Sequence, residues 1–343
     1  MNYSDTSRMF VPLCRLTGHG ADVTRGKIST DRNTIATGSA DKSLLIWNSA
    51  TGQAIRSFSG HSMEVTDLSF HGSGMGLFTS SIDGELRMFD LRSGSSAPTT
   101  MFGAKDDGTE FSCLAAGRSI NSPLLIGGTT CGQMRVFDIR KGSLSVCTFA
   151  HYNSLCSIEI SDDDDMLISS SLDGTIRLWS GKRGDCLMTV TDGTSNPSSC
   201  VYAGFMSNGE DFVGLFLDST VRHWNVRDRI NCQDKLKGPT MTNSTKTFGR
   251  LTSGGIAVPS EDGSIHFMDL TTGKPIQPPT KAHADDVLSV DVRGDLLVST
   301  GAGEDSSAVI WLQTENAAEA AEIKSGDFAI SYSLVSPQIE GLV

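Results

Sequence analysis

Short runs of apolar and β-branched residues alternate with turn residues along most of the chain, and the middle of the sequence shows this pattern most clearly. Residues 155–160 and 166–171 are two such runs, and the turn Asp173-Gly174 leads into a third at 175–179. An Asp-Gly pair between apolar runs is among the strongest local signals for a β-hairpin. The same pair recurs at 83–84 and 262–263, with variants at 41–42 and 218–219, and runs at 53–58 and 186–190 have the pattern of outer strands. The pattern predicts repeated strand–turn–strand units in an all-β protein.

The units recur with a regular period. Seven times an Asp, or a residue in its place, stands six residues before an aromatic residue or its substitute: Asp41/Trp47, Asp83/Phe89, Cys131/Phe137, Asp173/Trp179, Asp218/Trp224, Asp262/Met268 and Asp305/Trp311. Successive Asp positions are 42, 48, 42, 45, 44 and 43 residues apart, and a His precedes the Asp by 22 residues in four units, at His19, His61, His151 and His283. This is the period of WD-type propeller blades. We therefore predict a seven-bladed WD-repeat β-propeller over residues 17–312.

Both ends of the chain bear on how the ring closes. No clear outer strand follows Trp311, whereas residues 9–16, before the first unit, are apolar enough to supply one. We predict that the N-terminal segment, 1–16, completes the last blade, because closure in this way removes an exposed sheet edge. Residues 313–343 lie outside the repeats and form a tail, for which local packing, disorder and a docking role all remain open.

Composition narrows the class of partner. The 343 residues carry a net charge of −12, which argues against direct binding to nucleic acid and favours basic partners, such as histone tails or the basic tails of splicing or ribosomal proteins. We find no apolar run near the roughly 20 residues that span a bilayer and no secretory signal, so we expect no membrane association. Eight cysteines, at 14, 113, 131, 147, 156, 186, 200 and 232, show no metal-ligand spacing, and we expect most to be buried small hydrophobes in a reducing compartment.

The recurring His, Ser or Thr, and Asp residues invite comparison with a catalytic triad, for example His19, Ser39 and Asp41 beside Trp47. A catalytic site occurs once per chain, whereas this set recurs, so we interpret it as a buried structural network and expect no catalytic residue, cofactor or metal. Its members are His19, Asp41, Trp47, His61, Asp83, His151, Asp173, Trp179, Asp218, Trp224, Asp262, His283, Asp305 and Trp311.

Some units lack part of the set. The third has Thr109 at the His position and Cys131 at the Asp position, and the fifth and sixth lack the His, so we expect these blades to rely on apolar packing. The run 162–165, four carboxylates in a turn, is either a solvated turn or an attraction for a basic partner. Nothing in the sequence completes a calcium site there.

Several segments of individual blades are similar to one particular group of WD-repeat proteins. They are Ala150-His151, 169–174, 177–179, the 192–197 segment, 217–220 and the stretched turn 303–307. Together they resemble the WD-repeat scaffold subunits of COMPASS-type histone H3 lysine-4 methyltransferase complexes, and the unit 60–90 is equally similar to a spliceosomal WD subunit. The resemblance implies a site for arginine-containing peptides at the central opening of one face, where two aromatic rings stack on the guanidinium. One ring position corresponds to Phe111, which is either a pocket wall or a core residue, and the other corresponds to Thr245.

The resemblance also implies a second groove, between the fifth and sixth blades, where Asn208 and Phe248 match and Asp211, His223 and Arg250 replace apolar residues. The peptide-binding candidates are the residues just before each Asp position and those nearer the channel: Ala40, Ile82, Thr130, Leu172, Leu217, Glu261 and Glu304, with Thr66, Phe111, Cys156 and Thr245. The second-groove candidates are Asn208, His223 and Phe248.

These features predict a non-catalytic protein–protein interaction scaffold in a nuclear complex that regulates chromatin. The alternative is a WD-repeat subunit of a splicing or other ribonucleoprotein particle. In both cases we expect protein subunits as partners, including basic or arginine-containing peptides, with no direct nucleic-acid contact and no small-molecule substrate. We expect a nuclear location and leave the cytoplasm open as a second one.

Overall fold

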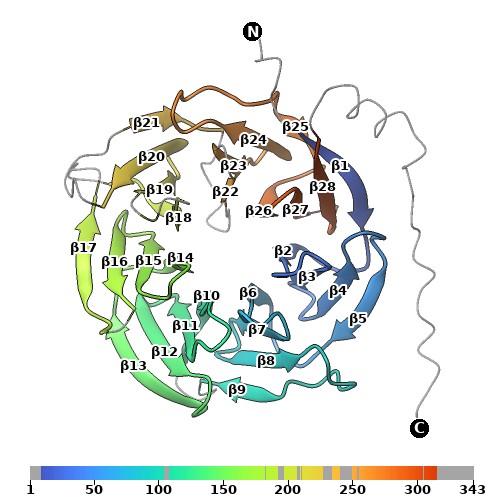
Figure 1. Cartoon of the computed structure of the whole chain (residues 1–343), viewed down its shortest axis with the longest axis vertical. Coiled ribbons are helices and arrows are strands. Elements are labelled where there is room, and N and C mark those ends of the chain that lie inside the picture. Colours follow the sequence, from blue (N-terminus) through green and yellow to red (C-terminus); the bar gives the residue numbers. More distant parts are fainter. Residues whose placement is uncertain are drawn as a thin grey trace.

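The computed structural model describes residues 9–103, 108–181, 183–191, 197–206, 209, 211–226, 234–239, 249–252, 255–303 and 305–314. Its strands form seven four-stranded antiparallel sheets, which stand as blades around a central channel (Figure 1). The predicted all-β, seven-bladed propeller is confirmed. Within this described part, no helix is long and apolar enough to cross a membrane.

The blades follow the chain in order, each with its first strand innermost. Blade 1 contains β2 (Val23–Ile28), β3 (Thr34–Ser39), β4 (Leu44–Asn48) and β5 (Ala54–Phe58), and blade 2 contains β6 (Val65–Phe70), β7 (Gly76–Ser81), β8 (Leu86–Asp90) and β9 (Thr100–Phe102). Blade 3 contains β10 (Phe111–Ala116), β11 (Leu124–Thr129), β12 (Gln133–Asp138) and β13 (Ser143–Phe149), and blade 4 contains β14 (Leu155–Ile160), β15 (Met166–Ser171), β16 (Ile176–Ser180) and β17 (Cys186–Val190). Blade 5 contains β18 (Cys200–Phe205), β19 (Asp211–Phe216), β20 (Thr220–Asn225) and β21 (Asp234–Lys237), and blade 6 contains β22 (Arg250–Thr252), β23 (Gly255–Pro259), β24 (Ser264–Met268) and β25 (Thr280–Lys281).

Blade 7 combines the two ends of the described chain. It contains β26 (Val287–Arg293), β27 (Leu296–Gly301), β28 (Ala308–Thr314) and, as its outer strand, β1 (Met9–Leu16), as Figure 1 shows. β1 pairs antiparallel with β28 from Met9↔Thr314 to Leu16↔Ala308, which confirms closure by the N-terminal strand. The tail was predicted to begin at 313, which is two residues too early, because 313 and 314 belong to β28. The rest of that tail, 315–343, lies outside the described residues.

The tight turns form where the sequence predicted them. Gly174, in the turn between β15 and β16, has φ of 79°, a left-handed conformation that costs glycine little because it has no Cβ. The variant turns take the same conformation without glycine, at Lys42 with φ of 73° and Ser219 with φ of 61°. These turns lie on one face of the propeller, which we call the Asp-turn face.

Apolar side chains fill the space between neighbouring blades. One cluster joins Leu16 of β1 with Ile35 and Trp47 of blade 1 and with Val298 and Ile310 of blade 7, so the closing strand is also packed into the core. Polar side chains link the innermost strands instead. Each of three hydroxyls on a first strand donates to a carbonyl on the next blade's first strand: Thr24 to Val65 at 2.6 Å, Thr66 to Phe111 at 2.9 Å and Ser112 to Leu155 at 2.7 Å. These bonds hold the wall of the channel together where no apolar core is available.

Candidate functional site

The repeated His and Asp side chains form a buried network in four blades. In blade 4, His151 Nδ1 lies 3.1 Å from Asp173, His151 Nε2 lies 2.8 Å from Ser169 Oγ, and the Trp179 indole donates to that same hydroxyl at 2.9 Å. Equivalent contacts recur at His19–Asp41, His61–Asp83 and His283–Asp305, and all four imidazoles are buried. The repetition and the burial both fit a structural role.

In blade 1 the network differs from the prediction in one member. In blade 1 the hydroxyl that meets the imidazole and the Trp47 indole is Thr37 Oγ1, at 2.8 Å from each. Ser39, the hydroxyl singled out from the sequence, instead donates to the Ala21 carbonyl and accepts from the backbone N–H of Asp41. The alternation of a strand explains the error, because Thr37 and Ser39 are two residues apart on the same face and spacing alone does not choose between them.

The carboxyl groups of the network are strongly acidic. Burial by itself raises their pKa, but in Asp41, Asp83 and Asp173 the hydrogen bond from the imidazole, with those from nearby backbone and hydroxyl groups, outweighs it. In Asp305 the hydrogen bonds from Arg15 and Ser307 and the charge of His283 do so. The pKa of Asp41, Asp83 and Asp173 therefore lies well below its usual range, and that of Asp305 is lowered to about 2.

The expectation that the incomplete blades rely on apolar packing alone is wrong for blade 5. There the buried guanidinium of Arg222 pairs with Asp218, donates to Thr220 Oγ1 at 3.0 Å and lies 4.0 Å from the centre of the Phe216 ring. Trp224, predicted to join the polar network, stacks on an aromatic ring instead, and its indole nitrogen has no hydrogen-bond partner among the described residues. Arg222 stands four residues after the Asp and takes over the role of the missing His.

The same position is polar in the other two incomplete blades. In blade 6, His266 Nε2 lies 3.0 Å from Ser264 Oγ, which in turn contacts Asp262 at 2.5 Å. In blade 3, Arg135 donates to Thr109 Oγ1 at 2.6 Å. A basic residue four residues after the Asp position also occurs in the complete blades 2 and 4, as Arg87 and Arg177, so an alternative network is indicated only where the His is missing as well.

The Asp-turn face carries a pocket at the mouth of the central channel. Its cavity, of about 340 Å³, is lined by Thr24, Glu64, Thr66, Ile82, Glu110, Ser112, Thr130, Ser154, Leu155, Cys156 and Leu172, from blades 1 to 4. Five peptide-binding candidates come together here: Thr66, Ile82, Thr130, Cys156 and Leu172. Ala40, Leu217 and Glu261 lie at the equivalent turns of other blades and do not line this pocket, and Thr245 and Glu304 lie outside the described residues.

Phe111 does not line the pocket. The side chain is 0% exposed and packs in the core between blades 2 and 3, so its interpretation as a pocket wall is wrong. In the register of the first strands, Phe111 pairs with Thr129 as Val65 pairs with Ser81, so Phe111 occupies an inward apolar position and Ser112 faces the channel. A one-residue difference in a strand turns a side chain to the opposite face.

Carboxylates stand before the first strands of four neighbouring blades, on one side of the channel mouth. The residue just before the first strand is acidic in four blades, Asp22, Glu64, Glu110 and Asp286, and is Ser154 and Ser199 in two more. In several blades its carbonyl accepts the backbone N–H of the residue before the Asp position, as Glu110 does from Thr130 at 3.0 Å, so these residues and the predicted rim residues are neighbours. The sequence could have revealed these carboxylates, since Asp or Glu stands directly before the first strand in four blades.

The electrostatics of this face are consistent with that composition. The pKa of Asp286 is raised by burial and further by the negative charges of Glu261, Asp285 and Asp22. A carboxyl whose pKa is raised by neighbouring carboxylates lies in a region of negative potential. None of the described residues that line the pocket is Lys or Arg, so the negative potential would stabilise a cation there.

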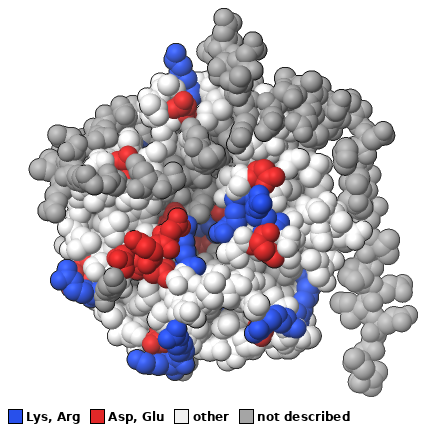
Figure 2. Space-filling model, in the orientation of Figure 1, with Lys and Arg blue, Asp and Glu red and all other residues white. Residues whose placement is uncertain are grey.

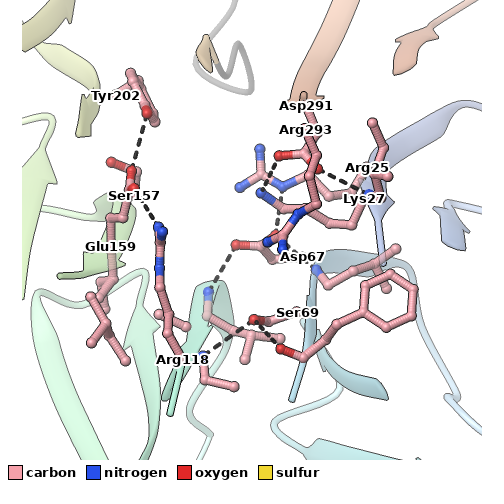
Figure 3. A pocket seen from close by; sticks show the side chains of 18 of the residues that line it. Arg25, Lys27, Asp67, Ser69, Arg118, Ser157, Glu159, Tyr202, Asp291 and Arg293 are labelled. Atoms are coloured by element: carbon pink, nitrogen blue, oxygen red, sulfur yellow. Dashed lines mark hydrogen bonds and ion pairs between the residues drawn. The ribbon is translucent and has the colours of Figure 1, made fainter. Parts of the chain in front are cut away.

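The opposite end of the channel is different. Figure 2 shows that face, with acidic side chains gathered on one side of the central opening, over β14 and β15, and basic ones across from them, over β2 and β26. A smaller cavity, of about 100 Å³, lies here and is crossed by charged pairs, which Figure 3 shows: Arg25 with Asp67 at 2.5 Å, Arg118 with Glu159 at 2.6 Å and Lys27 with Asp291 at 3.6 Å. Each of these pairs joins two neighbouring blades, so the charges at this end stabilise the contacts between blades.

The acidic turn 162–165 contributes a further ion pair and hydrogen bonds at this end of the channel. Asp162 pairs with Arg118 at 2.5 Å, and Asp164 accepts the backbone N–H groups of Arg118 at 2.8 Å and Ser119 at 3.1 Å. Asp164 therefore binds the turn of blade 3. Asp162, whose side chain is 87% exposed, and the exposed Asp163 and Asp165 fit the solvated turn that was one of the two expectations. The other expectation, attraction for a basic partner, stays a prediction. Among the described residues, no group of His, Cys, Asp or Glu could hold a metal ion.

The remaining candidates are less informative. His223 lies on β20 with its Nε2 3.6 Å from Asp211, and Asn208 and Phe248, the other second-groove candidates, lie outside the described residues. The cysteines only partly follow the prediction. Cys113, Cys156 and Cys200 are buried, and burial raises the pKa of their thiols, whereas Cys131, Cys147 and Cys186 are exposed.

Comparisons with known proteins place the repeats in a family. The family model described as WD domain, G-beta repeat matches residues 10–48, 52–90 and 143–180. The chain is 27% identical over 207 residues to the periodic tryptophan protein 2 homolog of Dictyostelium discoideum, covering 60% of this chain and 22% of the relative. It is 28% identical over 177 residues to the U5 small nuclear ribonucleoprotein 40 kDa protein of the same organism, covering 51% and 48%.

A third relative is the guanine nucleotide-binding protein subunit beta of Oryza sativa subsp. japonica, 30% identical over 194 residues, with 53% of this chain and 48% of the relative covered. The chain thus spans less than half of the length of each of these relatives. Proteins with this repeat generally act as non-catalytic scaffolds that bind other proteins. With three matched repeats and seven four-stranded blades, the chain is a seven-bladed WD-repeat β-propeller.

Proposed function

We propose that this protein is a non-catalytic scaffold that holds a basic segment of a protein partner at the pocket of the Asp-turn face. The observation that carries the proposal is the composition of that pocket. Ile82 and Leu172, both partly exposed, offer apolar surface for an anchoring side chain, and Glu64 and Glu110 stand at the mouth. A concave apolar site with a few polar groups at its rim suits a peptide side chain whose charged end stays near water.

The partner assembly that we favour is a nuclear ribonucleoprotein particle. The similarity to the U5 small nuclear ribonucleoprotein 40 kDa protein supports this candidate, and the net charge of −12 suits a subunit that contacts basic proteins rather than RNA. The second candidate is a histone methyltransferase complex. Its support is the resemblance of the blade-specific segments, and the arginine clamp that this resemblance implies loses one of its two ring positions because Phe111 is buried.

The pocket is tested by titration with a labelled, end-blocked peptide Lys-Arg-Leu-Arg-Lys, with Glu-Glu-Leu-Glu-Glu as the control peptide. We expect saturable binding of the basic peptide that weakens with added salt. Glu64→Gln and Glu110→Gln should each lower the affinity by about 2- to 5-fold, as expected for partly exposed ion pairs.

The matched control is Asp185→Asn, which removes one exposed carboxylate from the opposite face. It should leave the affinity unchanged. Equal binding of the two peptides, or no saturation at millimolar concentration, would remove the pocket from consideration. Affinity purification with mass spectrometry then separates the assemblies, since a small nuclear particle and a methyltransferase complex would bring different subunits with the protein.

A further inference from the structure

The outer strand of blade 3, β13, differs from the other outer strands. Its seven residues, Ser-Leu-Ser-Val-Cys-Thr-Phe over 143–149, include no charged residue and no proline, and all but Thr148 are exposed. The other outer strands are short or carry features that discourage pairing. β9 and β25 have three and two residues, β5 contains Arg56, β21 reads Asp-Lys-Leu-Lys, and β1 contains Pro12 and Arg15; β17 is also uncharged but has five residues.

β13 is also a sheet edge. It is the last strand of its sheet and pairs with β12, from Gln133↔Phe149 to Asp138↔Ser143. On the other side of such a strand, the N–H and C=O groups of alternate residues point outward and can pair with a further strand. Proteins usually protect long edges with charge, proline or a bulge that twists the edge away. β13 carries neither charge nor proline, and its one irregularity is a shift in the pairing at Ser145, which leaves residues 146–149 as a regular edge.

The side chains of this edge form an apolar strip. Because the pairing with β12 shifts by one residue between Leu144 and Val146, Leu144 lies on the same face of the strand as Cys147 and Phe149, and Val146 lies on the other face. Leu144 and Val146 have exposed fractions of 48% and 43%. At the far end, Phe149 is 74% exposed and Tyr152, just beyond the strand, is 93% exposed. Large apolar side chains that are gathered and exposed in this way mark an interaction surface.

The charges near the strip indicate what kind of chain fits. The turn between β12 and β13 contains Arg140 and Lys141, both exposed, and Figure 2 shows basic side chains at the rim below this part of the molecule. The remainder of the strand is neutral, whereas the whole chain carries −12. A second copy would thus bring two strongly negative bodies together. The strip is only about 23 Å long, which offers far less area than the roughly 1,200 Å² that stable protein pairs bury.

We propose that β13 is a docking edge for an extended segment of another protein, which adds to blade 3 as a fifth strand. The segment has apolar or β-branched residues at alternate positions, no charge and no proline in its middle, and carboxylates at the end beside Arg140 and Lys141. Strand addition of this kind draws its affinity from backbone hydrogen bonds and its specificity from alternate side chains. The site is remote from the pocket and gives the scaffold a second interface.

The test uses the full chain and a labelled, end-blocked peptide Glu-Glu-Val-Thr-Val-Thr-Val-Glu-Glu. Two control peptides replace the Glu residues by Lys or the central Val by Pro. We expect saturable binding of the first peptide, with at least 10-fold weaker binding of both controls. Hydrogen exchange should show that the peptide slows the exchange of alternate β13 amides, because these N–H groups enter the new ladder.

Two variants place the site. Leu144→Lys and Val146→Lys change exposed side chains, so the fold should persist, which circular dichroism checks, and each should weaken binding at least 10-fold. Ile55→Lys, on the outer strand of blade 1 with 55% exposure, is the matched control and should bind as the original protein does. Glu64→Gln should also bind normally, which separates this site from the pocket.

Three results would overturn the proposal. The first is the absence of saturation at 1 mM peptide. The second is an equal loss in the Ile55→Lys variant, which would indicate a general effect of added charge. The third is evidence that the edge is already covered before any peptide is added. This would be slow exchange of the outward β13 amides, or a dimer that Val146→Lys dissociates. In that case the edge is already covered by this chain or by a second copy.

Discussion

Replacement of Asp173 by alanine tests whether the repeated network is structural. The Asp173 carboxylate accepts hydrogen bonds from the His151 imidazole at 3.1 Å, the Tyr152 N–H at 3.0 Å and the Thr175 N–H at 2.9 Å. Loss of a buried charged partner leaves these donors unsatisfied, at a cost of about 3–5 kcal/mol in the free energy of unfolding. For a chain of this length, that cost corresponds to a fall in the thermal midpoint of about 4–7 °C.

The matched control is Asp262→Ala in blade 6. This Asp is exposed and makes local bonds to Ser264, at 2.9 Å and 2.5 Å, and to Ser260, so its loss should cost about 1 kcal/mol. Thermal and urea unfolding, followed by circular dichroism, measure both variants. Equal shifts for the two variants would refute the view that the buried imidazole makes the Asp173 bonds valuable. A normal midpoint for Asp173→Ala, combined with the loss of an enzymatic turnover, would refute the structural interpretation altogether.

Three further results are expected. Deletion of 1–16 removes the closing strand with its buried Phe10, Val11 and Leu16, so unfolding should become easier by about 5–9 kcal/mol; an unchanged thermal midpoint would defeat ring closure by β1. Arg222→Ala should cost about 3 kcal/mol in urea unfolding because it leaves Asp218 without its buried cation, and a neutral result would show that blade 5 needs no substitute for His. The pKa of His283 is lowered in the folded state, chiefly by burial, so its contribution to stability is complete above about pH 6.5 and is lost as the pH falls below that value. The thermal midpoint should therefore decline between pH 7 and 5. It should decline again below about pH 4, as Asp305, with a folded pKa of about 2, is protonated; a midpoint that rises on acidification would contradict both assignments.

The blades could be predicted because their signals are local. A tight turn needs Asp, Gly or a residue that tolerates positive φ, and strand pairing on either side needs apolar runs, so each hairpin is specified by about 15 neighbouring residues. Repetition then multiplies a weak signal seven times. Ring closure followed from a count of strands, since one blade lacked an outer strand and the N-terminal segment could supply it.

The lining of the channel mouth could be predicted only in part. Ile82, Thr130 and Leu172 were found from their position before the Asp, which the turn determines. Phe111 was not, because a side chain's face depends on strand register and a difference of one residue exchanges core for channel. The substitute network of Arg222 was also missed, since a side chain four residues along a strand reaches the Asp only when the hairpin brings both to one place.

The sequence by itself determined the number of blades, their turns and the segment that closes the ring, since each depends on residues close together in the chain. Only the fold showed that carboxylates from four neighbouring blades lie beside one opening of the channel. It also showed that ion pairs between neighbouring blades line the other opening, and that β13 is an exposed edge strand. Those properties arise from residues of separate blades, and only the ring brings such residues within the reach of a common partner.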